Sequence, residues 1–141
     1  MTIAYLDASV LVAFFTADRF SDRAEVLLQS QTSGVLVSNF AAAEFASVLA
    51  RLVRTKDMDI PAARTACTTF DGWVAKVGAR IEISGSDIAA AETMLRRFDL
   101  TLRSPDAIHL AAAQRLGARL ATFDTGLARC AEAIGVDVVL A

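Results

Sequence analysis

The chain has 141 residues, of which 55% are hydrophobic, and a formal net charge of -2 at pH 7. This length and composition suit a single compact domain over residues 1–141 with an ample buried core. The net charge argues against a protein that holds nucleic acid by general electrostatic attraction, but it does not exclude local contacts between single basic residues and nucleic acid. The apolar runs are much shorter than the roughly 20 residues that a membrane span needs.

The N-terminal stretch and the cysteines both indicate a cytoplasmic protein that does not enter a membrane. Asp7 interrupts the first apolar run, and no positive charge precedes that run, so a secretory signal is not expected. Cys67 and Cys130 fall inside predicted helices and lack the spacing of metal ligands. We therefore expect two reduced, partly buried thiols, as is usual in the cytoplasm.

Five short apolar runs alternate with helix-length segments along the chain. They are mostly apolar without strict alternation, which is typical of strands buried on both faces of a parallel sheet. We therefore predict an α/β fold with a central parallel sheet and helices on both of its sides. The predicted strands are residues 3–6, 35–38, 80–83, 119–123 and 136–140.

Helix starts are marked by small polar residues and by proline. Residues of this kind cap the free N–H groups of a first turn, and proline is favoured at the first helical position. Gly117 and Gly135 stand where a helix should end, because glycine tolerates the left-handed conformation found there. The predicted starts are Ser21, Ser38 or Asn39, Ile60 with Pro61, Ser86, and Ser104 with Pro105.

Acidic residues follow three of the predicted strands. Asp7 comes directly after the first strand, Asp124 directly after the fourth, and Glu44 lies in the early turns of the helix that follows the second. Asp106 is two positions beyond Ser104, in the first turn of its helix. Ligands bind beyond the carboxyl ends of parallel strands, so we expect these four carboxylates to converge at that edge.

Glu44 is the acid that helix capping explains least well. The three aspartates could each serve a helix N-terminus, but Glu44 stands inside its helix between Ala43 and Phe45, in a segment that should be buried. A lone acid in an apolar setting is costly unless it is paired or binds a metal. Oxygen ligands without nearby Cys or His favour Mg²⁺ or Mn²⁺ over zinc, and Mg²⁺ is commonly completed by substrate phosphates. The residues thus indicate divalent-metal phosphate chemistry.

The order of these motifs resembles the PIN domain, specifically the VapC-type toxins of toxin–antitoxin pairs. The matching segments are D-A-S from Asp7, Glu44 in the third helix, S-P-D-A-I-H-L-A from Ser104, and A-T-F-D-T-G-L around Asp124. The resemblance covers essentially the whole chain. It implies a Rossmann-like three-layer sandwich with about five strands, endoribonuclease activity dependent on Mg²⁺ or Mn²⁺, a homodimer, and inhibition by a cognate VapB-type antitoxin.

Carried over to this sequence, the resemblance assigns the metal site to four acids. Asp7, Glu44 and Asp106 match its three acidic positions, and Asp124 matches a more variable fourth. Ser9 and Thr122 match hydroxyl positions that support the site, although local capping explains both hydroxyls as well. All but two of the fourteen basic residues are arginine. Several lie in or beside helices where they could contact RNA phosphates, namely Arg51, Arg54, Arg96, Arg97 and Arg103, and we take Arg103 as the candidate phosphate contact.

His109 is the only histidine and lies one turn after Asp106 on the same predicted helix. It invites assignment as a general base. The resemblance places it outside the metal site, and carboxylate sites for Mg²⁺ rarely need imidazole. We therefore expect a partly buried packing residue.

Two other functions remain open. A receiver-like or dehalogenase-like phosphotransfer domain also gathers acids and Mg²⁺ at the carboxyl edge of a parallel sheet. Such proteins resemble one another in a paired or D-x-D acid after the first strand and a lysine near a later strand end, whereas this chain has D-A-S and neither Lys56 nor Lys76 is at a predicted strand end. The second alternative is a catalytically inactive PIN-like binding module, which an intact acidic set disfavours.

Overall fold

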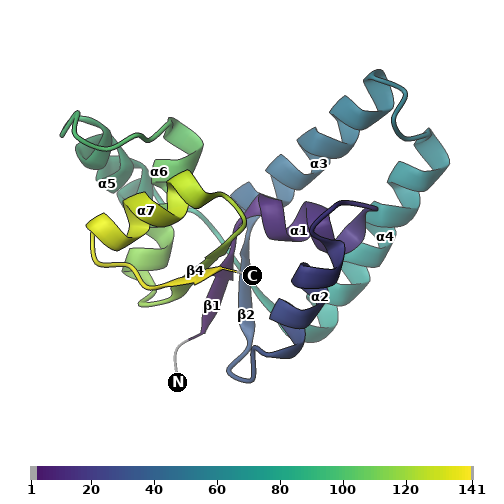
Figure 1. Ribbon diagram of the computed structural model, residues 1–141, viewed down its shortest axis with the longest axis horizontal. Helices are drawn as coiled ribbons and strands as arrows, with labels where there is room; N and C mark the ends of the chain where they lie inside the picture. The colour runs from purple at the N-terminus through teal and green to yellow at the C-terminus, as the bar shows by residue number, and fades with distance from the viewer. Residues whose placement is uncertain (1–2, 141) are drawn as a thin grey trace.

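The structure is a computed structural model that describes residues 3–140, and its centre is a five-stranded sheet (Figure 1). All the strand pairs are parallel, and the strand order is β3-β2-β1-β4-β5. The prediction of a parallel α/β sheet is confirmed. The strands are β1 (Ala4–Leu6), β2 (Val35–Ser38), β3 (Gly78–Ile81), β4 (Arg119–Thr122) and β5 (Val138–Leu140).

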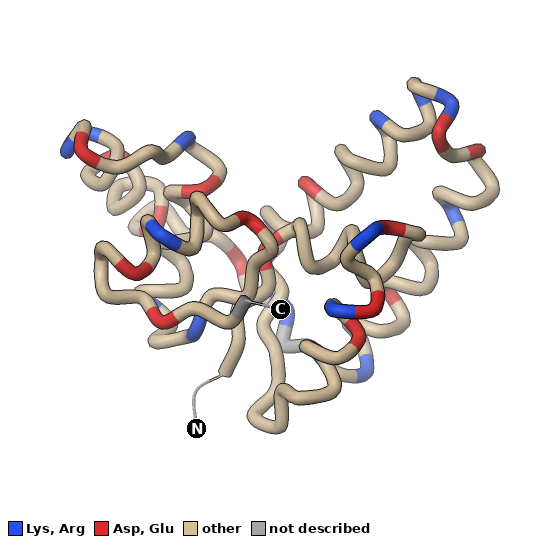
Figure 2. The backbone as a smooth tube through the Cα atoms, in the orientation of Figure 1, with Lys and Arg blue, Asp and Glu red and all other residues tan. Residues whose placement is uncertain are grey.

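Seven helices within residues 3–140 cover the two faces of the sheet (Figure 1). One face packs against α1 to α4 and the other against α5 to α7. In Figure 1, α3 and α4 form a hairpin that projects away from the sheet on the right, and Figure 2 shows both basic and acidic residues near the tip of this hairpin. The helices are α1 (Ala8–Phe15), α2 (Ser21–Gln29), α3 (Asn39–Arg54), α4 (Ile60–Val77), α5 (Gly85–Leu95), α6 (Ser104–Arg115) and α7 (Thr125–Ala133).

The central strand β1 shows how the two cores are separated. The Tyr5 side chain packs into the core under α5 to α7, whereas the side chains of Ala4 and Leu6 pack into the core under α1 to α4. All three residues are fully buried. Successive residues of a strand point to opposite faces of its sheet, and helices cover both faces here. An apolar run is therefore the sequence that this strand needs, with a polar residue tolerated only where the strand ends, at Asp7.

The bounds of β3 and α5 differ most from the sequence prediction, and β1, β4 and β5 are each one or two residues shorter than predicted. The third strand is Gly78–Ile81 instead of residues 80–83, because its ladder with β2 ends where Ser38 meets Ile81. Beyond that point the Ile83 N–H donates to the side chain of Asn39 instead of to a strand. The helix expected after Ser86 is capped by Ser84, which forms a reciprocal capping box with Asp87.

Two further serines are also not caps. Ser21 and Ser104 are the first helical residues, preceded by Phe20 and Arg103 in the cap positions. The predicted cap Ser38 is confirmed, since its hydroxyl accepts the Ala41 N–H.

The predicted helix stops at Gly117 and Gly135 are confirmed. Both residues have positive φ, at 60° and 85°, which is the conformation that a helix end requires and that glycine adopts without strain. Cys130 is buried, Cys67 is half-buried, and neither forms a disulfide. No helix within residues 3–140 is long and apolar enough to cross a membrane. Residues 1, 2 and 141 of the predicted domain lie outside the described residues.

Candidate active site

Three of the four predicted acids follow three neighbouring strands. β1 lies between β2 and β4 in the sheet. Asp7 follows β1 and caps α1, Asp124 comes two residues after β4 and caps α7, and Glu44 lies on α3 after β2. Because the strands are parallel, these residues stand at one edge of the sheet. Asp106 lies in the first turn of α6, the helix that also carries His109.

Asp7 is a buried carboxylate held by hydroxyl groups. Its exposed fraction is 5%. One oxygen accepts hydrogen bonds from the Ser9 hydroxyl at 2.6 Å and the Val10 N–H at 3.3 Å, and the other accepts from the Thr122 hydroxyl at 2.5 Å. Burial raises the pKa of Asp7, and the hydrogen bonds offset this only in part. Within residues 3–140 no lysine or arginine pairs with Asp7, so its negative charge lacks a cationic partner from those side chains.

The same two hydroxyls connect Asp7 to the loop that follows β4. Ser9 Oγ accepts the Phe123 N–H at 3.1 Å, and Thr122 Oγ1 accepts the Asp124 N–H at 3.0 Å. Each hydroxyl therefore donates to Asp7 and accepts a backbone N–H from the loop after β4. The structure thus places both predicted supporting hydroxyls between Asp7 and Asp124. The Asp124 side chain is exposed, and its Oδ1 accepts the first free N–H groups of α7.

Glu44 contacts His109, which the sequence interpretation had set apart from the site. Glu44 Oε1 lies against His109 Nε2, within hydrogen-bonding distance. A carboxylate only accepts, so the ring N–H donates to it. The expectation that Glu44 lies in an apolar setting is wrong, since its side chain is 29% exposed and faces α6 across the sheet edge.

His109 is itself fixed from its other side. The residue is 3% exposed, and its Nδ1 lies 2.6 Å from the hydroxyl of Tyr5, which in turn bonds the Ser38 hydroxyl at 2.9 Å. Burial raises the pKa of Tyr5 well above its ordinary value, so this hydroxyl stays protonated. His109 therefore orients Glu44 from the core instead of only filling space. Its position one turn after Asp106 was the only signal in the sequence for this role.

Asp106 is half-buried in the first turn of α6. Its Oδ2 accepts the Arg103 N–H at 3.3 Å, which closes the start of the helix. α6 also carries His109, whose side chain contacts Glu44 of α3. The Arg103 side chain, our candidate phosphate contact, is exposed.

The chemistry of these donors fits a hard divalent cation. Every candidate ligand is a carboxylate oxygen, and the buried Asp7 has no lysine or arginine partner within residues 3–140. As the side chains stand, no three acidic, His or Cys groups in residues 3–140 are close enough together to hold one ion. Each carboxylate is instead turned toward a local donor: Asp7 to hydroxyls, Glu44 to His109, Asp106 to the Arg103 backbone, and Asp124 to the start of α7.

Comparison with known proteins identifies the family. The PIN domain family model matches residues 4–133, so the chain belongs to the PIN domain family. No curated protein sequence matches the chain.

Several solved structures share the fold over nearly their whole length. VapC20 of Mycobacterium tuberculosis, described as a toxin that cleaves the sarcin–ricin loop, is 20% identical, with a TM-score of 0.72 over 94% of this chain and 95% of that one. FitAcB from Neisseria gonorrhoeae is 18% identical, with a TM-score of 0.76 over 96% of both chains. A toxin–antitoxin complex from Klebsiella pneumoniae is 23% identical, with a TM-score of 0.62 over 96% of this chain and 95% of that one. At these identities the likeness establishes the fold.

Proposed function

We propose that this chain is a Mg²⁺- or Mn²⁺-dependent endoribonuclease that acts as the toxin of a toxin–antitoxin pair. The observation that carries the proposal is the arrangement in a PIN fold of Asp7 and Asp124 just after two adjacent parallel strands, with Glu44 in the second turn of the helix that follows a third and Asp106 in the first turn of α6. Structural neighbours that are themselves toxins or toxin–antitoxin complexes support the same role.

Asp7, Glu44, Asp106 and Asp124 are the residues proposed to hold the cation. When bound, such an ion lowers the pKa of a water molecule and neutralises charge on the phosphate that is attacked. Asp7 needs little reorganisation for this role, since Ser9 and Thr122 already fix both of its oxygens. His109 fixes the orientation of Glu44, as the partners of metal ligands commonly do.

The proposal includes two macromolecular partners besides a second copy of the chain. RNA is the substrate, and a VapB-type antitoxin is the inhibitor. Structural neighbours include VapBC complexes from Rickettsia felis and Salmonella typhimurium, which support an antitoxin partner. We further propose a homodimer within the cytoplasm and a single nuclease domain over residues 1–141.

The decisive experiment compares RNA cleavage by the purified wild type and the Asp106→Asn variant. An amide is a poorer ligand for Mg²⁺ than a carboxylate, so the variant should lose cleavage while its thermal unfolding changes little. EDTA should abolish cleavage by the wild type, and Mg²⁺ or Mn²⁺ should restore it. Retained cleavage by folded Asp106→Asn, together with indifference of the wild type to EDTA, would contradict the proposal. Stable phosphorylation of Asp7 by a small phosphodonor would instead favour a phosphotransfer domain.

A further inference from the structure

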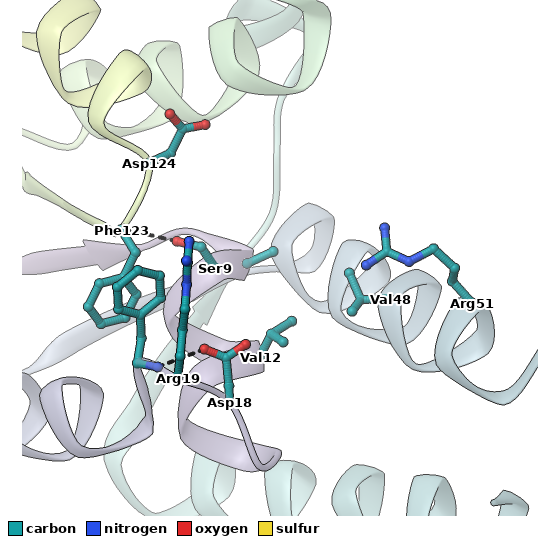
Figure 3. A pocket seen from close by; sticks show the side chains of 10 residues that line it. Ser9, Val12, Asp18, Arg19, Val48, Arg51, Phe123 and Asp124 are labelled. Carbon is teal, nitrogen blue, oxygen red and sulfur yellow. Dashed lines mark hydrogen bonds between the residues drawn. The ribbon is translucent and has the colours of Figure 1, made fainter. Parts of the chain in front are cut away.

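A cavity of about 420 Å³, within the size range of small-ligand sites, is lined in part by Asp124 of the candidate site (Figure 3). Ser9 and Asp124 line its end nearest the cluster, so the cavity and the candidate metal site share a wall. The rest of the wall comes from the turn between α1 and α2, from α3, and from the loop after β4. Arg19, Phe20, Arg51 and Phe123 are its main side chains.

Arg19 is presented by a turn that hydrogen bonds hold in place. The Asp18 N–H donates to the Ser21 hydroxyl at 3.0 Å, and the Phe20 N–H donates to the Asp18 carboxylate at 2.8 Å. The Ser21 hydroxyl donates in turn to the Thr16 carbonyl at 2.9 Å. Asp18 also lines the cavity, but its carboxylate is engaged within the turn. The backbone that carries Arg19 is therefore ordered before any ligand arrives.

An aromatic pair supports the arginine side chain. Phe20 and Phe123 stack with ring centroids 4.7 Å apart and an interplanar angle of 5°. The guanidinium of Arg19 lies 4.6 Å from the centroid of Phe20, and that of Arg23 lies over both rings. Cation–π contacts of this kind limit the freedom of a long side chain. The pair thus joins the turn before α2 to the loop that carries Asp124.

Arg51 approaches the cavity from the other side. Figure 3 shows its guanidinium coming from α3, opposite Arg19, with Asp124 beyond them. Neither arginine belongs to an ion pair formed within residues 3–140. Two guanidinium groups without a carboxylate partner therefore face one cavity that opens beside the acids. Guanidinium groups suit phosphates because they donate two parallel hydrogen bonds.

We propose that this cavity binds the unpaired nucleotide next to the scissile phosphate of an RNA substrate, with Arg19 and Arg51 contacting its phosphate groups. Phe123 and the Arg19 guanidinium cover the two faces of Phe20, so the edges of the aromatic pair offer the apolar wall for the base. This inference rests on the proposed ribonuclease function and adds the place where the RNA strand lies. It also assigns the main phosphate contacts to Arg19 and Arg51 in place of Arg103, the residue expected from the sequence.

The test measures binding of a short single-stranded RNA by fluorescence anisotropy, in the Asp106→Asn background so that the RNA stays intact. Arg19→Ala and Arg51→Ala should each weaken binding about tenfold, the effect of one lost charge-assisted hydrogen bond. Each should also reduce the slope of log affinity against log salt by about 0.7, the value for one phosphate contact on a single strand. Arg51→Lys should restore the salt slope but only part of the affinity.

Arg54→Ala is the matched control. Arg54 lies one turn further along α3 and lines a different groove, so removing it should change RNA affinity by less than twofold. A fluorescent 2-aminopurine placed at successive positions of the RNA should be quenched at one position, and Phe20→Leu should relieve that quenching.

The possible outcomes separate this inference from the proposed function. Equal losses in Arg51→Ala and Arg54→Ala would mean diffuse electrostatic binding and would overturn the cavity as the subsite. If the wild type cleaves RNA but Arg19→Ala and Arg51→Ala bind RNA as tightly as their parent protein, the inference is overturned and the proposed ribonuclease function stands. Failure of the wild type both to bind and to cleave RNA would overturn both.

Discussion

Two buried aspartates of this protein, Asp7 and Asp87, have opposite surroundings. Asp87 is 1% exposed and accepts two hydrogen bonds from the Arg115 guanidinium, at 2.7 and 2.9 Å. It also accepts the Ser84 N–H at 2.9 Å. These partners, Arg115 foremost, hold the pKa of Asp87 below its ordinary value. Asp7 is almost equally buried but is bonded mainly by hydroxyls, and burial raises its pKa.

The partners of each buried aspartate determine what its charge contributes to the fold. Asp87 lies at the start of α5 and Arg115 at the end of α6, so their ion pair holds two neighbouring helices together. The protein itself compensates the charge of Asp87. The charge of Asp7 has no lysine or arginine partner within residues 3–140, although the nearby His109 favours its ionised form. A divalent cation would compensate the charge more fully. Burial alone does not distinguish a structural acid from a functional one; the partners do.

The largest effect should be on RNA cleavage. Asp7→Asn should reduce the rate by about 100-fold or more, since even partners of metal ligands commonly contribute 10- to 100-fold. Asp87→Asn should leave the rate per folded molecule close to that of the wild type. Initial rates should be measured well below the melting temperature of each variant, with the folded fraction checked by circular dichroism. A similar loss in both variants would remove the functional distinction between the two acids.

The next effect should be on stability, and in the reverse order. Asp87→Ala should lower the free energy of unfolding by about 2–3 kcal/mol, because it removes charge-assisted hydrogen bonds to a buried carboxylate. Asp7→Asn should leave metal-free stability unchanged or raise it, since a desolvated charge is removed. Urea unfolding in EDTA tests both changes.

Arg96→Ala serves as the control for this measurement. It breaks the exposed pair of Arg96 with Glu92, whose side chains are 74% and 65% exposed, and should not differ from the wild type within error. Equal losses in Asp87→Ala and Arg96→Ala would contradict the structural role of the buried pair.

The strands were predictable because each is an apolar run between helix-length segments, and the parallel sheet followed from that pattern. The residues at which strands and helices begin and end were less predictable. The bounds of β3 depend on how far β2 extends beside it, and the cap of α5 depends on a reciprocal bond between Ser84 and Asp87. These are pairwise choices that a local pattern leaves open.

The acids of the candidate site were visible in the sequence because each follows a strand or starts a helix. Their partners were not visible. His109 meets Glu44 across 65 positions and Arg115 meets Asp87 across 28, so only the folded arrangement of α6 relative to α3 and α5 brings them together. The cavity beside the site was missed for a related reason: Arg19 comes from the turn before α2 and Arg51 from α3, and these segments meet only in the folded chain.

A smaller effect should appear when Mg²⁺ is added. A ligand that binds only the folded protein, at ten times its dissociation constant, should stabilise it by about 1.4 kcal/mol. The wild type and Asp87→Asn should both show this gain, and Asp7→Asn should lack most of it. Thermal unfolding across a Mg²⁺ titration, with Na⁺ at matched ionic strength as the control, measures the effect. An equal gain in Asp7→Asn would place the bound ion elsewhere.

The smallest effect should be the dependence of stability on pH in the metal-free protein, where the two acids act in opposite directions. The folded pKa of Asp87 lies below its unfolded value of about 3.9. Its contribution is therefore complete above that pH and is lost as the pH falls through the folded pKa. The folded pKa of Asp7 lies above its unfolded value, so the cost of its charge is absent in acid and appears as the pH rises through the folded pKa.

Urea unfolding between about pH 3 and pH 7 should resolve these contributions, since one group changes stability by less than about 1.4 kcal/mol per pH unit. The advantage of Asp7→Asn over the wild type should grow as the pH rises above about 4, the range in which the deficit of Asp87→Asn has become constant. An advantage of Asp7→Asn that does not change with pH would mean that Asp7 keeps an ordinary pKa, and hence that another group of the protein already compensates its charge.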